Sequence, residues 1–328
     1  MSFRDIIDQD YAVTILQDQL KSKRINHAYL LLGKDGVGKK TLAFQFARAL
    51  LCEKEDNDSC DKCINCRRID HHNHPDVTLI SPEEDASSIK IDQIRNLQKE
   101  IAYKPYETEH KIYIIDEAEK MSVQAANSLL KTLEEPPAYA VIILLAESTS
   151  SLLSTIASRC QHITLSNISQ KSIKNYLQNQ GIKEDRARLL AGLARGSLGR
   201  ASEINENEDF LKRRKEILNF LKKIHQSHTI TLFSMAEKMQ QYHKKGFPLF
   251  NLLSDWYRDI MIYKEGNHEQ IVNLDYLETF AEQKNIYSIK EILSIIDLLD
   301  EYDKYLENNV RADLTIEVLL LKIRAKRI

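Results

Sequence analysis

The sequence has no surplus of basic side chains. Its 46 lysine and arginine residues are balanced by 48 aspartate and glutamate residues, which gives a formal net charge of −2. A protein that grips nucleic acid alone usually carries a basic surplus, so contact with DNA is expected to be local or shared with partners. This balance, and the lack of an obvious strand-separating module, argue against a stand-alone helicase.

Long apolar runs are also missing. No stretch approaches the roughly 20 apolar residues of a membrane span, and the start of the chain is too polar for a secretory signal peptide. We therefore expect a cytoplasmic protein with no membrane partner. Its five cysteines should be reduced in that compartment, so cysteines at short spacing indicate a metal site rather than disulfides.

Glycine and proline are scarce and unevenly placed. Of nine glycines and six prolines, only Gly266 lies beyond residue 250. Buried-strand runs at 27–32, 111–115 and 140–145 alternate with helical patterns, which predicts a parallel sheet covered on both faces. Further along, apolar residues recur every three or four positions and predict a region that is nearly all helix.

These patterns predict three domains and their fold classes. Residues 1–164 should form an α/β P-loop domain with a parallel sheet, and 165–206 a small helical domain. Residues 207–328 should form an all-α C-terminal domain. The first domain also carries a cysteine-rich insert at 52–66.

A phosphate-binding loop follows the first predicted strand. Residues 33–39 read Gly-Lys-Asp-Gly-Val-Gly-Lys and precede a helix predicted over 41–51, which is the required context for a G-x-x-x-x-G-K motif. The next residue should be a Mg²⁺-binding Ser or Thr, but it is Lys40. Thr41 cannot simply take over, because one helical residue rotates the side chain by about 100°. The nucleotide-binding candidates in this loop are Gly33, Gly36, Gly38, Lys39, Lys40 and Thr41.

Two acids, Asp116 and Glu117, follow the strand predicted at 111–115. Such a pair is typical of a Walker B strand, in which the Asp would hold Mg²⁺ and the Glu would orient the attacking water. Two acids can also mark only the start of a loop, and a glycine-rich turn can lack a ligand. Together the motifs favour binding of ATP or ADP with Mg²⁺, whereas hydrolysis is not supported because of Lys40.

A cysteine set with the spacing C-x7-C-x2-C-x2-C lies in the insert. Four thiolates at this spacing can close a tetrahedral Zn²⁺ site, which would be structural because no coordination position stays open. The alternative is four free thiols. His71, His72 and His74 follow closely and are expected to be surface residues rather than ligands. The predicted metal ligands are Cys52, Cys60, Cys63 and Cys66.

Two further motifs lie beyond the acids. Residues 127–137 read Asn-Ser-Leu-Leu-Lys-Thr-Leu-Glu-Glu-Pro-Pro, an amphipathic helix ended by two prolines, whose chemistry alone indicates packing. Arg159 stands in a Ser-Arg-Cys motif after the third strand. Alone, an arginine at a helix end is usually solvated or a partner of the helix dipole.

In this order, the motifs resemble the bacterial sliding-clamp loader subunits of DNA polymerase III, a P-loop AAA+ family and part of a DNA-directed DNA polymerase holoenzyme. The resemblance is strong over the first 200 residues. It continues more weakly in Trp256-Tyr257-Arg258-Asp259 and the closing leucine-rich helix, which are similar to the family's collar domain. It implies a lid at 165–206 and a collar at 207–328, although amphipathic helices alone also suit an ordinary intramolecular bundle.

The resemblance also implies partners and a role for Arg159. The partners would be tau/gamma-type and delta-type subunits in a hetero-pentameric ring, the sliding clamp, and primer-template DNA within the assembly. Arg159 would act in trans as an arginine finger on the γ-phosphate held by a neighbouring subunit. Such a finger is worth about 10³ to 10⁵ in rate.

The family splits into ATP-hydrolysing motors of the tau/gamma type and a delta-prime type that does not hydrolyse ATP. A motor needs the hydroxyl that Lys40 replaces. It also needs a sensor arginine in a Gly-Ser-x-Arg context, where this chain has Gly199 and places Arg200 one residue late. A polar sensor after the third strand could be Glu147 or Ser148. These differences favour the delta-prime branch, a stator with little or no ATPase activity of its own.

Two alternatives remain at this stage. The chain could be a motor in which Thr41 or a water supplies the missing ligand. It could also be a scaffold that binds no nucleotide. ATP turnover and ATP binding, measured with and without Mg²⁺, would separate the three hypotheses.

Overall fold

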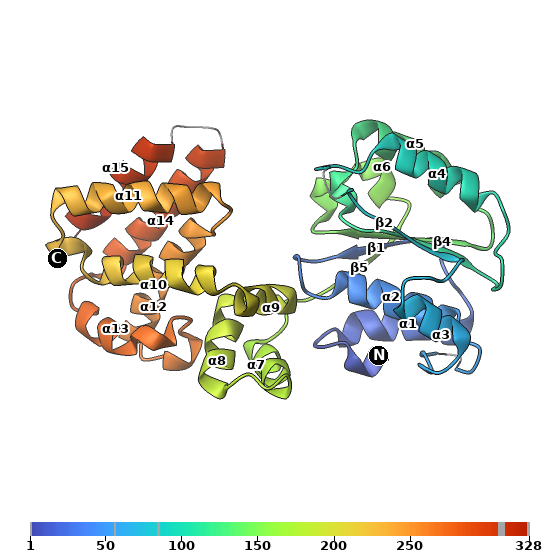
Figure 1. Cartoon of the computed structure of the whole chain (residues 1–328), viewed down its shortest axis with the longest axis horizontal. Coiled ribbons are helices and arrows are strands. Elements are labelled where there is room, and N and C mark those ends of the chain that lie inside the picture. Colours follow the sequence, from blue (N-terminus) through green and yellow to red (C-terminus); the bar gives the residue numbers. More distant parts are fainter. Residues whose placement is uncertain (1, 56, 84–85, 308–311, 327–328) are drawn as a thin grey trace. The chain divides into compact units, whose positions relative to one another are not determined.

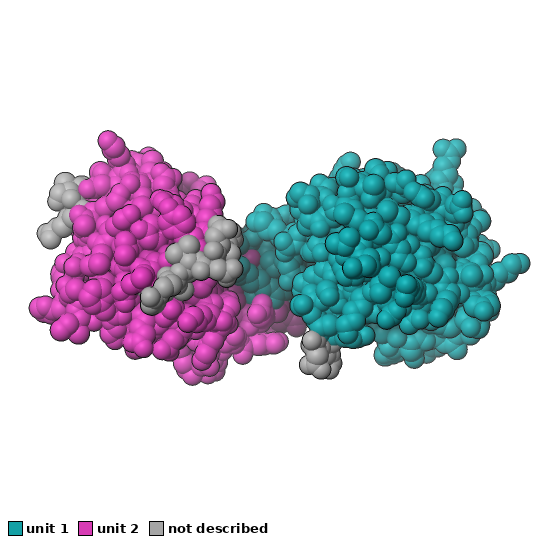
Figure 2. Space-filling model, turned by 90° about the horizontal axis from the view of Figure 1, so that it is seen from above, with its two compact units in different colours: residues 1–176, 195–200 teal, residues 177–194, 201–328 magenta. Residues whose placement is uncertain are grey.

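The structure is a computed structural model that describes residues 2–55, 57–83, 86–307 and 312–326. The chain divides into two compact units, the first made of residues 1–176 and 195–200, the second of 177–194 and 201–328 (Figure 2). This two-way division does not set three boundaries, so the predicted domain ranges stay predictions.

The first unit contains one sheet of five parallel strands in the order β2-β3-β4-β1-β5. The three predicted strands are present at its centre, and each is buried along its whole length. The other two are short strands at the edges that the sequence did not reveal. The strands are β1 (Ala28–Leu32), β2 (Val77–Ile80), β3 (Lys111–Ile115), β4 (Ala140–Ala146) and β5 (Gln161–Thr164).

Helices cover both faces of this sheet (Figure 1). Alternate side chains of the central strands enter two separate cores, since Leu31 packs toward one face and Leu30 toward the other. The predicted α/β P-loop domain with a parallel sheet is therefore confirmed. One face carries α1 (Asp10–Ser22), α2 (Lys39–Leu50) and α3 (Ile64–Asp70), and the other carries α4 (Ile91–Ile101), α5 (Val123–Glu134) and α6 (Ser154–Ala157). Short 3-10 turns lie at Phe3–Asp5, Ala118–Lys120 and Thr149–Ser151.

Beyond the sheet, the described residues form helices joined by loops, as predicted. The second unit has its own core around the fully buried Trp256 and Tyr257. Within the described residues, no helix is both long and apolar enough to cross a membrane. The helices are α7 (Gln170–Asn179), α8 (Glu184–Leu193), α9 (Leu198–Glu206), α10 (Glu208–Lys222), α11 (Thr229–Lys244), α12 (Leu249–Lys264), α13 (Leu277–Gln283), α14 (Ile289–Glu307) and α15 (Ala312–Ala325), with 3-10 turns at Ile224–Gln226, His268–Gln270 and Leu274–Tyr276.

A buried polar network joins α10 and α12 to the segment before α13. The carboxylate of Asp259 is fully buried and accepts hydrogen bonds from the backbone N–H groups of Val272 (3.0 Å) and Asn273 (2.7 Å). Arg214 donates to Asn273 Oδ1 (2.7 Å) and binds the carboxylate of Asp275. Burial raises the pKa of Asp259 to about 6, although the N–H donors lower it in part.

Candidate functional site

The predicted nucleotide-binding residues lie together at the carboxyl ends of the central strands. Parallel strands all end on the same side of the sheet, so the loop after β1 and the acids after β3 come close to each other there. The helix after the loop begins at Lys39, two residues earlier than predicted, with Gly38 as its N-cap. Gly36 (φ +71°) and Gly38 (φ +102°) have left-handed backbone conformations, which glycine adopts without steric cost.

The two lysines after these glycines both bind groups of the protein itself. Lys39 Nζ donates to the carbonyl oxygens of Gly33 (2.7 Å) and Lys34 (3.0 Å). Lys40 Nζ forms an ion pair with Asp116 Oδ2 at 3.2 Å. The misplaced lysine therefore reaches the acid that would hold Mg²⁺ in an ATPase, and it brings a positive charge to that place.

The second acid is also paired. Glu117 has a left-handed backbone conformation (φ +51°), and its Oε1 lies 2.5 Å from Lys120 Nζ. This hydrogen bond raises the pKa of Lys120. Among the described residues, no hydrogen bond or ion pair joins Thr41 to either acid. Both acids therefore follow β3 as predicted, and each is paired with a lysine of the chain itself.

A third contact on the loop comes from the start of α9. The N–H of Gly199 donates to the carbonyl oxygen of Gly36 at 3.0 Å. A Cβ atom on Gly199 would lie only 2.9 Å from the Cα of Gly36, and one on Gly36 would lie 2.2 Å from Ser197 Oγ. Residue 199, where the family resemblance expects a sensor arginine in a motor, can therefore carry no side chain unless the loop moves.

Arg159 follows α6 and stays partly exposed. Its side chain is 36% exposed, Nη2 lies 2.6 Å from Glu134 Oε1, and Nη1 donates to the carbonyl oxygen of Thr155 at 2.8 Å. A partly exposed guanidinium can be reached by a group from outside the chain. Its role in trans stays a prediction.

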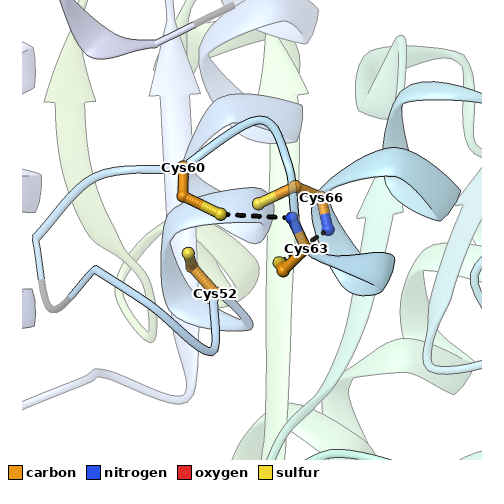
Figure 3. A group of neighbouring side chains, drawn as sticks. All are labelled: Cys52, Cys60, Cys63 and Cys66. Atoms are coloured by element: carbon orange, nitrogen blue, oxygen red, sulfur yellow. Dashed lines mark hydrogen bonds between the residues drawn. The ribbon is translucent and has the colours of Figure 1, made fainter.

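The four cysteines of the insert converge, as Figure 3 shows. Their sulfur atoms all lie within 4.8 Å of one another. Sulfur atoms around a tetrahedral zinc would be about 3.8 Å apart, given Zn–S bonds of about 2.3 Å, so the cluster fits the metal after small adjustments. Backbone N–H groups of Lys62 and Cys63 lower the pKa of Cys60 to about 6, which favours a thiolate. Burial raises the pKa of Cys66.

The histidines beyond the cysteines are not ligands of this cluster. His71 and His72 are exposed, as expected. The expectation was wrong for His74, which is buried. Its Nδ1 accepts from the N–H of Asp76 (3.1 Å), and its Nε2 lies 3.3 Å from Asn65 Oδ1. Both ring nitrogens are thus used within the fold.

The sequence did not reveal which residues hold the cysteine insert and Arg159 in place. Arg48 of α2 is 5% exposed and binds Asp61 and Asp70, which ties the cysteine loop and α3 to the P-loop helix. A lysine or arginine in an amphipathic helix normally has a solvated side chain. No sequence signal therefore indicated that Arg48 is buried. Glu134 lies in the motif at 127–137, but the sequence did not reveal that it pairs with Arg159.

Comparisons with known proteins agree over nearly the whole chain. A family model described as "DNA polymerase III, delta subunit" matches residues 8–169, and one for its C-terminal part matches 208–325. DNA polymerase III subunit delta' of Bacillus subtilis is 31% identical over 96% of this chain and 96% of its own length. The corresponding subunit of Haemophilus influenzae is 28% identical over 83% of this chain and 82% of its own.

Two further proteins are similar to this chain. DNA polymerase III subunit tau of Bacillus subtilis is 28% identical over 98% of this chain and 61% of its own length. A gamma subunit-related protein of Thermotoga maritima, solved as a crystal structure, is 18% identical with a TM-score of 0.43, covering 96% of this chain and 99% of its own.

Proposed function

Because this chain belongs to the family of DNA polymerase III delta' subunits, we propose that it serves the clamp loader as a stator. It does not hydrolyse ATP itself, and it supplies Arg159 to the ATP of a neighbouring subunit. In this role it helps to load the sliding clamp onto primed DNA. Its partners are tau/gamma-type and delta-type subunits in a pentameric ring that encloses primer-template DNA.

The ion pair between Lys40 and Asp116 is the observation that carries this proposal. Hydrolysis in P-loop proteins requires Mg²⁺ held by a hydroxyl and an acid. Here the hydroxyl is missing, and an ammonium group binds the acid instead. A divalent cation would have to displace Lys40 and tolerate its charge nearby.

The chain's own loop is further satisfied by internal contacts. Lys39 binds loop carbonyl oxygens, and Gly199 closes against Gly36 where a motor would carry its sensor arginine. If ATP or ADP binds here, these residues would have to exchange their present partners for phosphate oxygens. Weak or absent nucleotide binding is thus the expected state.

The four cysteines are proposed as ligands of a structural Zn²⁺. Their sulfur atoms converge, and two of the four cysteines, Cys63 and Cys66, are buried. The metal would supply folding free energy to the insert and no catalytic chemistry, because all four positions are protein ligands.

Exposed apolar side chains support assembly through the second unit. Leu314 and Val318 lie one turn apart on α15 and are 50% and 41% exposed, and Ile230 on α11 is 84% exposed. These two helices pack on each other within the unit. Apolar groups on neighbouring helices are typical of surfaces that other subunits cover.

Substitution of Arg159 tests the proposal. In a loader reconstituted with its tau/gamma-type and delta-type partners, Arg159→Ala should lower hydrolysis at the adjacent ATP site by about 10³-fold or more, while the ring still assembles. Steady-state ATPase rates and size-exclusion chromatography would measure the two effects. Arg68→Ala is a matched control, since Arg68 is 35% exposed and also pairs with a single glutamate, Glu107.

The isolated chain separates the alternatives. It should show no ATP turnover above background. ATP turnover at the rate of a motor subunit would instead show that the chain is an ATP-hydrolysing subunit of the tau/gamma type. Unchanged ATPase activity of the assembled Arg159→Ala loader would show that this arginine is not a finger.

A further inference from the structure

Two sequence motifs meet at one ion pair, which joins Glu134 to Arg159, 25 residues further along the chain. Glu134 ends α5, the helix of the Leu-Leu-Lys-Thr-Leu-Glu-Glu-Pro-Pro motif, and its Oε1 lies 2.6 Å from Nη2 of Arg159. From its sequence alone, this helix was predicted only to pack against the rest of the domain. The buried face of the helix accounts for its apolar residues but not for Glu134, whose side chain is 50% exposed.

The position of Glu134 is unfavourable for an isolated helix. A carboxylate in the last turn faces the negative end of the helix dipole, where a cation would be preferred. Two prolines, Pro136 and Pro137, end the helix directly afterwards and so fix where the carboxylate lies. Arg159 supplies the positive charge that this place requires.

The guanidinium is anchored on two sides. Nη2 binds Glu134, and Nη1 donates to the carbonyl oxygen of Thr155, which belongs to α6. A planar guanidinium has five N–H donors, so contacts at both terminal nitrogens restrict its plane and still leave donors for phosphate. A long, flexible side chain is thereby ordered before any partner arrives.

We propose that Glu134 is a positioning residue that holds Arg159 ready for the phosphate of a neighbouring subunit's ATP. This rests on the proposed function, since only an arginine finger would need such positioning. Exposed ion pairs contribute little to stability, whereas phosphate binds a guanidinium more strongly and with two hydrogen bonds. Glu134 therefore orders the side chain without trapping it.

Three variants test this in the reconstituted loader. Glu134→Ala should lower kcat at the adjacent site by about tenfold and leave the KM for ATP nearly unchanged, because loss of orientation acts on the chemical step. Glu134→Gln keeps an acceptor oxygen and should recover part of the rate. Glu135→Ala is the matched control, an exposed glutamate next in sequence for which the structure shows no ion pair within its described residues.

A second measurement uses the isolated chain. The ¹⁵N relaxation of the Arg159 side chain should show greater mobility in Glu134→Ala than in the wild type or in Glu135→Ala. A merely structural role for Glu134 would change the melting temperature rather than this local mobility.

The outcomes separate the two proposals. If Arg159→Ala lowers the ATPase rate and Glu134→Ala does not, the positioning role is wrong and the finger stands. If Glu135→Ala lowers kcat as much as Glu134→Ala, the effect is one of general charge and the positioning role is again wrong. If Arg159→Ala has no effect, the proposed function fails and the positioning role fails with it.

Discussion

Lys40 stands where an ATPase needs a hydroxyl, and its ammonium group binds the acid that would hold the metal. Lys40→Thr removes this charge, frees Asp116 and restores the hydroxyl in one change. We expect the variant to gain Mg²⁺-dependent binding of a fluorescent ADP by at least about tenfold over the wild type. Titrations in Mg²⁺ and in EDTA would measure it.

Lys34→Thr is the control for this change, since Lys34 is an exposed lysine of the same loop. It removes one positive charge without freeing Asp116, so it should not create Mg²⁺ dependence. If Lys34→Thr and Lys40→Thr behave alike, total loop charge and not the ion pair limits nucleotide binding.

Asp259 should make the second unit more stable in mild acid. Its folded pKa of about 6 lies above the usual value near 3.9, so the folded state binds more protons between these two values. Stability is therefore greatest below about pH 4 with respect to this group, and it falls as pH rises through about 6. Across this pH range, the contribution of Asp259 to the free energy of unfolding should change by an amount on the order of 3 kcal/mol.

Urea unfolding from pH 4 to 7 would measure this slope. Asp259→Asn cannot ionise, so its stability should lack this component, and the difference from the wild type isolates it from other carboxylates. Asp209→Asn, at an exposed position, serves as control. Parallel curves for the wild type and Asp259→Asn would contradict the prediction.

For individual residues, the sequence revealed the residue types of the site but not the side chains with which they pair. The phosphate loop, the acids and the cysteines were recognisable because their chemistry depends on local spacing. The pairs of Lys40 with Asp116 and of Arg159 with Glu134 join different elements of the fold. Local spacing carries no record of such contacts, since they depend on how the strands are ordered in the sheet.

Strands and helices were likewise predictable only where they leave a local pattern in the sequence. The central strands β1, β3 and β4 were predicted because burial on both faces makes them continuously apolar. The edge strands β2 and β5 have four residues each and are only partly buried, so they lack that signal. The helical C-terminal region was predicted because packed helices need apolar residues every three or four positions.

The cysteine insert should depend on metal for its stability. We expect about one zinc per purified chain. Removal by a chelator under reducing conditions should lower the melting temperature of the first unit by about 5–10 °C, which corresponds to a few kcal/mol in a unit of this size. Elemental analysis and differential scanning calorimetry would measure both quantities.

The fifth cysteine provides the control. Cys160 lies outside the cluster, and burial raises its pKa to about 12, so it should remain an unreactive thiol. Cys160→Ser should retain zinc, whereas Cys60→Ser leaves three thiolates and should lose it. Full zinc content in Cys60→Ser would exclude the four-cysteine site.

For the molecule as a whole, assembly should depend on the exposed apolar residues of α15. Leu314→Glu combined with Val318→Glu should prevent co-elution with partner subunits and leave the circular dichroism spectrum unchanged, because exposed substitutions rarely alter stability by more than about 0.5 kcal/mol. Tyr11→Glu, at a 74% exposed position of the first unit, is the control. Retained co-elution of the double variant would mean that other surfaces make the ring.

The closure of Gly199 on Gly36 has a consequence for how the subunit responds to its surroundings. A protein that binds a ligand only when folded becomes more stable as that ligand accumulates, so its melting temperature reports the ligand concentration. On the proposed function, this subunit binds nucleotide weakly or not at all, so its melting temperature should depend little on the concentration of ATP or ADP. On the proposed function, the conformation of the neighbouring motor subunits would change with the cellular ratio of ATP to ADP. This subunit would keep one conformation at high and at low ratios.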